Sequence, residues 1–159
     1  MNDKKEIINR FYSAFQKLDH EAMNGCYSDD IVFNDPVFGL LQGGEVKAMW
    51  KMLCSSAKDF SLTYSDIQTD DDEYFTCQWK AVYTFPGTGR KVENRVKAFM
   101  RINDNKIVEH TDAFSLSAWM AQALGWKGTL FGWTSLMRRG VQRTARKKLE
   151  RFLVKDSLQ

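Results

Sequence analysis

Residues 27–39 read YSDDIVFNDPVFG, and this stretch decides the fold that we expect. It joins a short apolar run, Ile31 to Phe33, to an Asn-Asp-Pro sequence. Pro36 cannot donate a backbone hydrogen bond to a neighbouring strand, and it disfavours the helical conformation at the residue before it. We therefore predict a short strand that stops at Asp35 and leaves a carboxylate at its end.

Helical patterns surround this strand. Upstream, apolar residues recur at helical spacing over residues 7–18 and again over 22–27, where Asp19 is placed to cap the second helix. Downstream, Gly43 and Gly44 precede a third helical pattern, whose apolar residues are Val46, Met49, Trp50 and Leu53. The sequence therefore predicts three helices in its first third.

From residue 60 the apolar period changes to two. Alternation predicts strands near 60–67, 75–85, 92–102 and 107–114, separated by polar or Gly-containing turns. Helices followed by a strand meander are typical of an α+β fold with one antiparallel sheet and the helices on one of its faces. We assign residues 1–116 to this domain and 117–159 to a helical extension that packs on or near it.

Composition narrows the class of protein. The chain has 159 residues, enough for one domain, and 13% of them are aromatic, which suits a cavity for apolar ligands. Its three cysteines, Cys26, Cys54 and Cys77, lack disulfide or metal spacing, so we expect buried, reduced thiols. Those thiols and the absence of a leader-like apolar run predict a cytoplasmic protein. No phosphate-binding loop or metal motif occurs, so we expect no cofactor and no metal.

Charge is unevenly distributed. Residues 138–159 carry eight basic and two acidic residues, a net charge of +6, whereas the rest of the chain is at −3. The helix predicted there has one apolar stripe, so it either packs on the domain and closes a cavity, or docks on an anionic membrane or a partner. We favour packing. Nucleic-acid binding is not expected, because no motif supports it and the main domain is acidic.

The stretch at residues 27–39 resembles the end of the second helix and the first strand of ketosteroid isomerases. Together with the element order, it identifies the chain as similar to the NTF2-like superfamily, which includes the SnoaL-like proteins. The resemblance covers residues 5–115. It implies a cone-shaped cavity for a small apolar molecule and a homodimer that forms through the open face of the sheet.

The resemblance also implies a role for Asp35. In the isomerases, the Asp before Pro is the general base that moves a proton between two carbon atoms of the substrate. Their two oxyanion donors, a Tyr on the first helix and a protonated Asp on a strand, fall on Phe11 and Ala98 here. Because both donors are missing, we do not expect steroid isomerisation itself.

His110, Asp112 and Phe114 share one face of the last predicted strand. Strand geometry puts the first two side chains roughly 7 Å apart, close enough to share a ligand but too far for an assured direct bond. Asp112 is placed to orient His110 as an acid, a base or a polarising donor. Limonene epoxide hydrolases share the fold and a last-strand Asp, but their remaining catalytic residues fall on Gln78 and Lys80, so epoxide opening is the weaker hypothesis.

Two functions remain open. The first is a cofactor-independent proton-transfer enzyme for a small apolar carbonyl or polyketide-like compound, and the second is a non-catalytic carrier or sensor. The candidate catalytic residues are Asp35, His110 and Asp112, and the candidate ligand contacts are Phe11, Phe15, Phe33, Trp50, Trp79, Ala98 and Phe114. Each has a plainer structural interpretation, as turn cap or core residue. Convergence of the polar groups on one cavity favours the enzyme.

Overall fold

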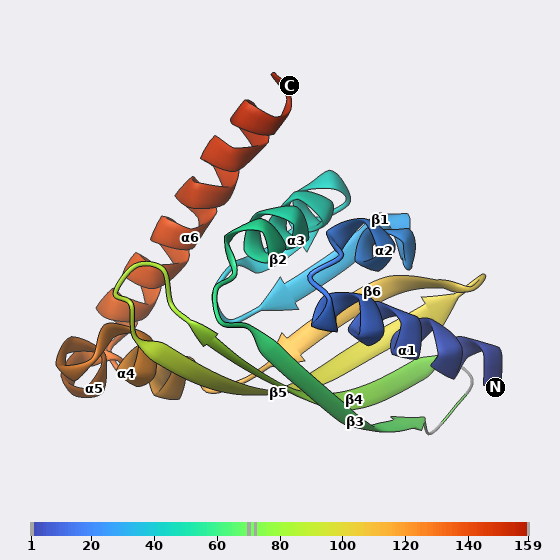
Figure 1. Ribbon diagram of the computed structural model, residues 1–159, viewed down its shortest axis with the longest axis horizontal. Helices are drawn as coiled ribbons and strands as arrows, with labels where there is room; N and C mark the ends of the chain where they lie inside the picture. Colours follow the sequence, from blue (N-terminus) through green and yellow to red (C-terminus); the bar gives the residue numbers. More distant parts are fainter. Residues whose placement is uncertain (1, 70, 72, 159) are drawn as a thin grey trace.

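The computed structural model describes residues 2–69, 71 and 73–158. Three helices cover one face of a curved sheet, which confirms the predicted α+β fold (Figure 1). The elements in chain order are α1 (Asn2–Gln16), α2 (His20–Gly25), β1 (Tyr27–Asp35), β2 (Gly39–Gln42), α3 (Gly44–Ser56), β3 (Ser61–Thr69), β4 (Tyr74–Thr84), β5 (Lys91–Asn103), β6 (Lys106–Ala113), α4 (Leu116–Leu124), α5 (Trp126–Phe131) and α6 (Ser135–Asp156).

The sheet has the strand order β2-β1-β6-β5-β4-β3. Strands β3 to β6 form the predicted antiparallel meander, and their register pairs Ala98 with Asp112. Strand β1 lies parallel to β6, which the sequence did not predict, and Phe33 pairs with His110 there. This pairing brings the stretch at residues 27–39 beside the last strand.

The first strand ends at Asp35, as predicted, but it starts earlier than expected. It begins at Tyr27, which we had expected in the second helix, because α2 ends at Gly25. It then turns back into β2, which was not predicted, and the turn pairs Asp35 with Gly39. Gly39 has a φ of 69°, a conformation that glycine adopts at little cost.

The outer face of the sheet is polar. Arg95 pairs with Glu93 at 2.7 Å, and Arg101 pairs with Glu109 at the same distance. Lys97 is also exposed, and its ammonium lies over the Phe99 ring. Apart from the exposed Phe99, the apolar residues of β5 therefore face the helices, and its charged residues face outward.

The C-terminal segment forms separate helices, and α6 contacts the domain. Helix α5 is separated from α6, and Thr134 caps α6 by accepting from the Met137 amide. Leu149 of α6 is buried, and Gln142 donates to the Pro36 carbonyl at 3.0 Å. Although α6 has 22 residues, no helix in the described part of the chain is long and apolar enough to cross a membrane.

Candidate functional site

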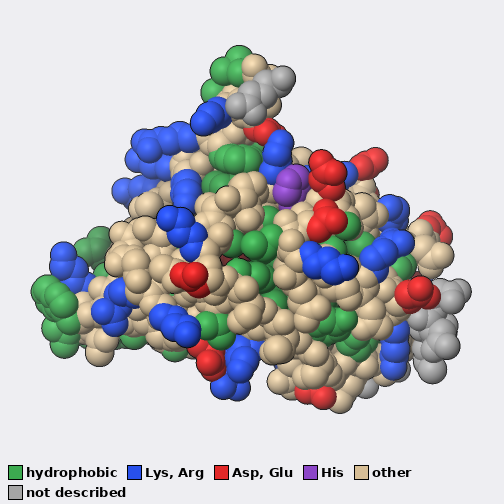
Figure 2. Space-filling view, viewed as in Figure 1, with side chains coloured by type: hydrophobic (Ala, Val, Ile, Leu, Met, Phe, Trp, Pro, Cys, Tyr) green, Lys and Arg blue, Asp and Glu red, His purple; other side chains and the backbone are tan. Residues whose placement is uncertain are grey.

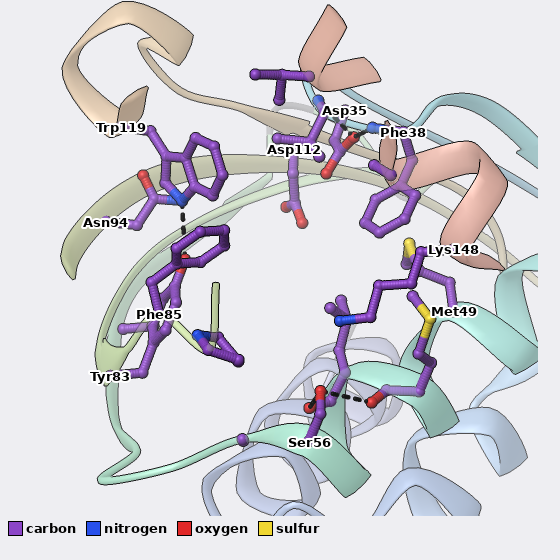
Figure 3. Close-up of a pocket in the computed structure, with 18 of the residues that line it drawn as sticks. Asp35, Phe38, Met49, Ser56, Tyr83, Phe85, Asn94, Asp112, Trp119 and Lys148 are labelled. Atoms are coloured by element: carbon purple, nitrogen blue, oxygen red, sulfur yellow. Dashed lines mark hydrogen bonds between the residues drawn. The ribbon is translucent and has the colours of Figure 1, made fainter. Parts of the chain in front are cut away.

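A cavity of about 590 Å³ lies between the concave face of the sheet and the helices (Figure 3). This volume falls within the range of small-molecule sites. Its wall is mainly apolar, and its large aromatic contributions come from Phe15, Phe33, Trp50, Trp79, Phe85 and Trp119. Helix α6 completes the wall through residues such as Met137 and Val141. The chain thus encloses an apolar hollow, and the C-terminal helix forms one side of it.

Asp35 lines this cavity from the end of β1. Its Oδ1 accepts hydrogen bonds from the backbone amides of Val37 at 2.9 Å and Phe38 at 2.5 Å, so the carboxylate does cap its own turn. Burial raises the pKa of Asp35 from 3.8 to about 7; the amide of Phe38 opposes this rise and the charge of Asp112 adds to it. A carboxylate with this pKa exchanges protons near neutral pH.

Asp112 lines the same cavity from β6, and its carboxylate projects into the hollow (Figure 3). Two side chains hold one oxygen of this carboxylate. Trp79 Nε1 donates to Oδ1 at 3.2 Å, and His110 Nε2 lies 3.0 Å from the same atom. The geometry leaves Oδ2 as the oxygen of Asp112 without a protein donor among the described residues.

His110 stands behind Asp112 and does not line the cavity. Its Nδ1 lies 2.7 Å from the Tyr27 hydroxyl, which accepts from Trp50 Nε1 at 3.0 Å. An ionised Asp112 carboxylate only accepts, so its contact with Nε2 places a proton on that nitrogen, and in the neutral ring Nδ1 then accepts from the Tyr27 hydroxyl. Both ring nitrogens are therefore engaged within the protein.

This arrangement corrects one expectation. His110 and Asp112 were expected to be roughly 7 Å apart along the strand, yet their side-chain atoms are in direct contact at 3.0 Å. Alternation places them on one face, and two side chains that lean toward each other close the remaining distance. His110 therefore meets a ligand only through Asp112.

The predicted ligand contacts divide into two groups. Phe15, Phe33, Trp50, Trp79 and Phe114 line the cavity. Phe11 and Ala98 do not: both are completely buried and absent from the cavity wall. The Phe11 ring instead packs against the rings of Tyr27, Trp50 and His110, so this residue supports the wall from behind.

The wall also has polar side chains besides Asp35 and Asp112, among them Tyr83, Asn94 and Lys148. Tyr83 on β4 accepts a hydrogen bond from Trp119 Nε1 at 2.8 Å, which leaves its own O–H available to a ligand. Asn94 lies on β5 between the buried Val92 and Val96, and Lys148 extends from α6 toward the hollow (Figure 3). The sequence signal for Asn94 was its place among valines that alternate along the inward face of β5. The sequence contained no corresponding signal for Lys148.

Other site types find little support in the described residues. No three His, Cys, Asp or Glu side chains gather there as a metal site would require. Gln78 and Lys80, the positions of the epoxide hydrolase residues, belong to the opposite face of β4 from Trp79 and do not line the cavity. All three cysteines are buried, as expected.

Comparison with known proteins places this geometry in a family. The model of the SnoaL-like domain matches residues 8–110. No curated protein matches the sequence.

Several solved structures share the fold. A Catenulispora acidiphila protein with a ketosteroid isomerase-like fold, solved with trimethylamine, has a TM-score of 0.65 at 17% identity and covers 74% of this chain and 92% of its own. A "putative polyketide cyclase" from Silicibacter has a TM-score of 0.64 at 19% identity, with 77% and 96% covered. A "putative isomerase" from Bacillus subtilis has a TM-score of 0.66 at 14% identity, with 78% and 94% covered.

At these identities the likeness concerns the fold, and the family model carries the assignment. It matches most of the segment from α1 to β6, which supplies Asp35, Asp112 and the sheet side of the cavity. By this match, the chain belongs to the SnoaL-like domain family.

Proposed function

We propose that this protein binds a small apolar carbonyl or polyketide-like compound and catalyses a proton transfer on it without a cofactor. The observation that carries the proposal is Asp35: a carboxylate on the wall of an apolar cavity, with a pKa of about 7. Solved proteins of the same fold that are named as a cyclase and an isomerase support the same class of chemistry.

The proposed reaction begins at a carbon next to the carbonyl group of the ligand. Asp35 takes the proton, the C–H electron pair moves toward the carbonyl oxygen, and an enolate forms. Protonated Asp35 then returns the proton to another carbon of the conjugated system, so the double bond shifts and no oxidant or reductant is consumed. The chain's part is to position the ligand, exclude water and hold one proton on Asp35.

The growing charge on the carbonyl oxygen needs a donor. Family-type donors are missing at Phe11 and Ala98, but the Tyr83 hydroxyl and the Asn94 amide line the same cavity. Either can donate to an enolate oxygen, a contribution that typically amounts to a few kcal/mol in a dry site. In this proposal His110 is a positioning residue, which fixes Asp112 without touching the ligand.

The test compares Asp35→Asn with Asp30→Asn, an exposed acid on the same strand. The substrate is first identified by mass spectrometry of whatever copurifies, supplemented by a panel of unsaturated ketones. We expect Asp35→Asn to lower kcat by about 10²- to 10⁴-fold and Asp30→Asn to leave it unchanged. Turnover that survives in both variants would show that Asp35 is not the base.

A carrier or sensor remains the second candidate. It is favoured by one observation: the acid–base partner expected at the cavity, His110, has both ring nitrogens engaged elsewhere. A carrier returns its ligand chemically unchanged, and Asp35→Asn then alters affinity alone. NMR of the released ligand separates the two, because proton transfer from one carbon to another moves the double bond, whereas a carrier leaves it in place.

The expected homodimer and the cytoplasmic location stay predictions. The outer face of the sheet, where the resemblance places the dimer, carries the exposed pairs Arg95–Glu93 and Arg101–Glu109. Sedimentation of the wild type and of Arg101→Glu tests the dimer, because charge reversal there would place two acids together and weaken a contact through this face.

A further inference from the structure

The end of the molecule formed by α5 and the start of α6 exposes an unusual set of large apolar side chains. We call it the α5 tip and define it by five residues that are at least half exposed: Trp126 (66%), Leu130 (56%), Phe131 (50%), Trp133 (75%) and Leu136 (82%). Exposed single hydrophobic residues are ordinary, but five within eleven residues, two of them tryptophans, mark a binding surface.

The charged residues near the tip in sequence are all basic. Residues 113–149 contain seven Lys or Arg and no Asp or Glu. Lys127, Arg138 and Arg139 adjoin the tip residues in sequence and are exposed. Figure 2 shows hydrophobic side chains gathered at the end where Figure 1 places α5, with Lys and Arg side chains along the neighbouring α6. The tip is thus an apolar surface bordered by cations.

The shape of the tip suits a flat partner. Helix α5 protrudes at one extremity of the molecule, beyond the end of the sheet (Figure 1). It is held there by close packing, since Gly128 lies so near the Met120 carbonyl that a Cβ would sit 1.9 Å from that oxygen. Trp133 donates its Nε1 proton to the Leu130 carbonyl at 2.8 Å, so its ring can enter an apolar phase with its donor satisfied.

These observations select one occupant. A second copy meeting the first through its tip would bring Lys127, Arg138 and Arg139 against the same cations, which disfavours self-association. An anionic bilayer instead offers phosphates and carboxylates to the cations, and an apolar interior to tryptophan, leucine and phenylalanine. We propose that the α5 tip docks the protein on the surface of an anionic lipid membrane.

The tip adjoins the cavity wall, so docking would bring the cavity close to the membrane. Leu136 belongs to the tip, and the next residue, Met137, lines the cavity together with Trp119 and Leu124 of α4. An apolar ligand dissolved in the membrane would therefore lie beside the wall formed by α4 and α6. Docking does not depend on the chemistry of Asp35, so either proposal can fail alone.

The experiment measures sedimentation of the full-length protein with vesicles of phosphatidylcholine alone and of phosphatidylcholine mixed with phosphatidylserine. We expect binding to the mixed vesicles only, and weaker binding as salt is raised. The double variant Trp133→Ser with Leu136→Ser, and the double variant Arg138→Glu with Arg139→Glu, should each lower the partition coefficient about tenfold or more. None of these four residues lines the cavity.

A matched control is Tyr74→Ser, which removes an exposed aromatic residue at the start of β4, outside the tip. It should bind vesicles like the wild type, and circular dichroism should show all variants folded. Three results would overturn the proposal: no binding to phosphatidylserine vesicles, equal binding by the tip variants, or a dimer in sedimentation velocity that the tip variants convert to monomer. The last result would assign the tip to a second copy of the chain.

Discussion

Asp35 combines two roles that the sequence presented as alternatives. Its Oδ1 accepts from the amides of Val37 and Phe38, as a residue that merely ends a strand would. The same carboxyl also lines an apolar cavity near Asp112. The turn fixes its position and the cavity sets its proton affinity, so one residue is both rigid and basic.

The raised pKa of Asp35 predicts a pH-dependent stability. The unfolded chain releases this proton near pH 4, whereas the folded protein holds it until about pH 7. The free energy of unfolding therefore falls as pH rises between these values, by at most about 4 kcal/mol. Asp35→Asn keeps an acceptor for the turn and should remove this decline, which urea unfolding at pH 5 and at pH 8 measures. An unchanged decline in the variant would assign it to other groups.

Asp112 should control the basicity of Asp35. Its charge is one of the causes that raise the Asp35 pKa, after burial. Asp112→Asn removes this charge while retaining an oxygen that can accept from Trp79, so the pKa of Asp35 should fall below 7. Carboxyl-detected NMR titration measures this shift. The matched control is Asp29→Asn, a fully exposed acid that should leave the Asp35 titration in place.

At the scale of elements, the sequence predicted the parts with strong periodicity. The alternation near 92–102 and the helical spacing of 7–18 correspond to β5 and α1, because burying one face requires such spacing. It missed β2, whose four residues, Gly39–Gln42, are too short to show a period.

The same limits explain the site. Asp35, Asp112 and about half of the aromatic wall were predicted from helix and strand faces and from the resemblance. The enclosure of His110 was not, because it depends on Tyr27, which reaches it only through the parallel pairing of β1 with β6. Lys148 was also missed, since the position of α6 over the cavity is a long-range property that no local pattern encodes.

Alanine substitutions at two glycines should change stability in opposite directions, because Gly128 of α5 is packed tightly against α4 and Gly140 of α6 is not. Gly128→Ala would press a methyl group into the Met120 backbone and should lower stability by about 1–3 kcal/mol. Gly140→Ala on α6 meets no atom within 4 Å and should raise stability by about 0.5–1 kcal/mol, because alanine favours a helix. Thermal unfolding measures both, and destabilisation of similar size in the two variants would contradict the packing argument.

At the scale of the whole molecule, an apolar cavity of about 590 Å³ gives room for a ligand and lowers the stability of the free protein. Ala81→Leu adds atoms inside this cavity, so it should raise the unfolding temperature of the free protein and weaken the binding of an apolar fluorescent probe. Ala113→Leu adds the same atoms at an exposed position of β6 and should change neither. A lowered unfolding temperature in Ala81→Leu would mean that this part of the wall is already filled.

The parallel pairing of β1 with β6 also governs how the chain is made. Residues 33 and 110 are neighbours in the sheet but are separated by the whole meander in sequence. During synthesis from the N-terminus, β1 has only β2 as a partner until the last strand has left the ribosome. A nascent chain that ends within β5 therefore contains the Asp35 turn without β6 beside it. The apolar residues that β6 would cover stay exposed, and we expect chaperones to bind them. The final strand thus completes the sheet late in synthesis, and the pocket is complete only after α6 has followed it.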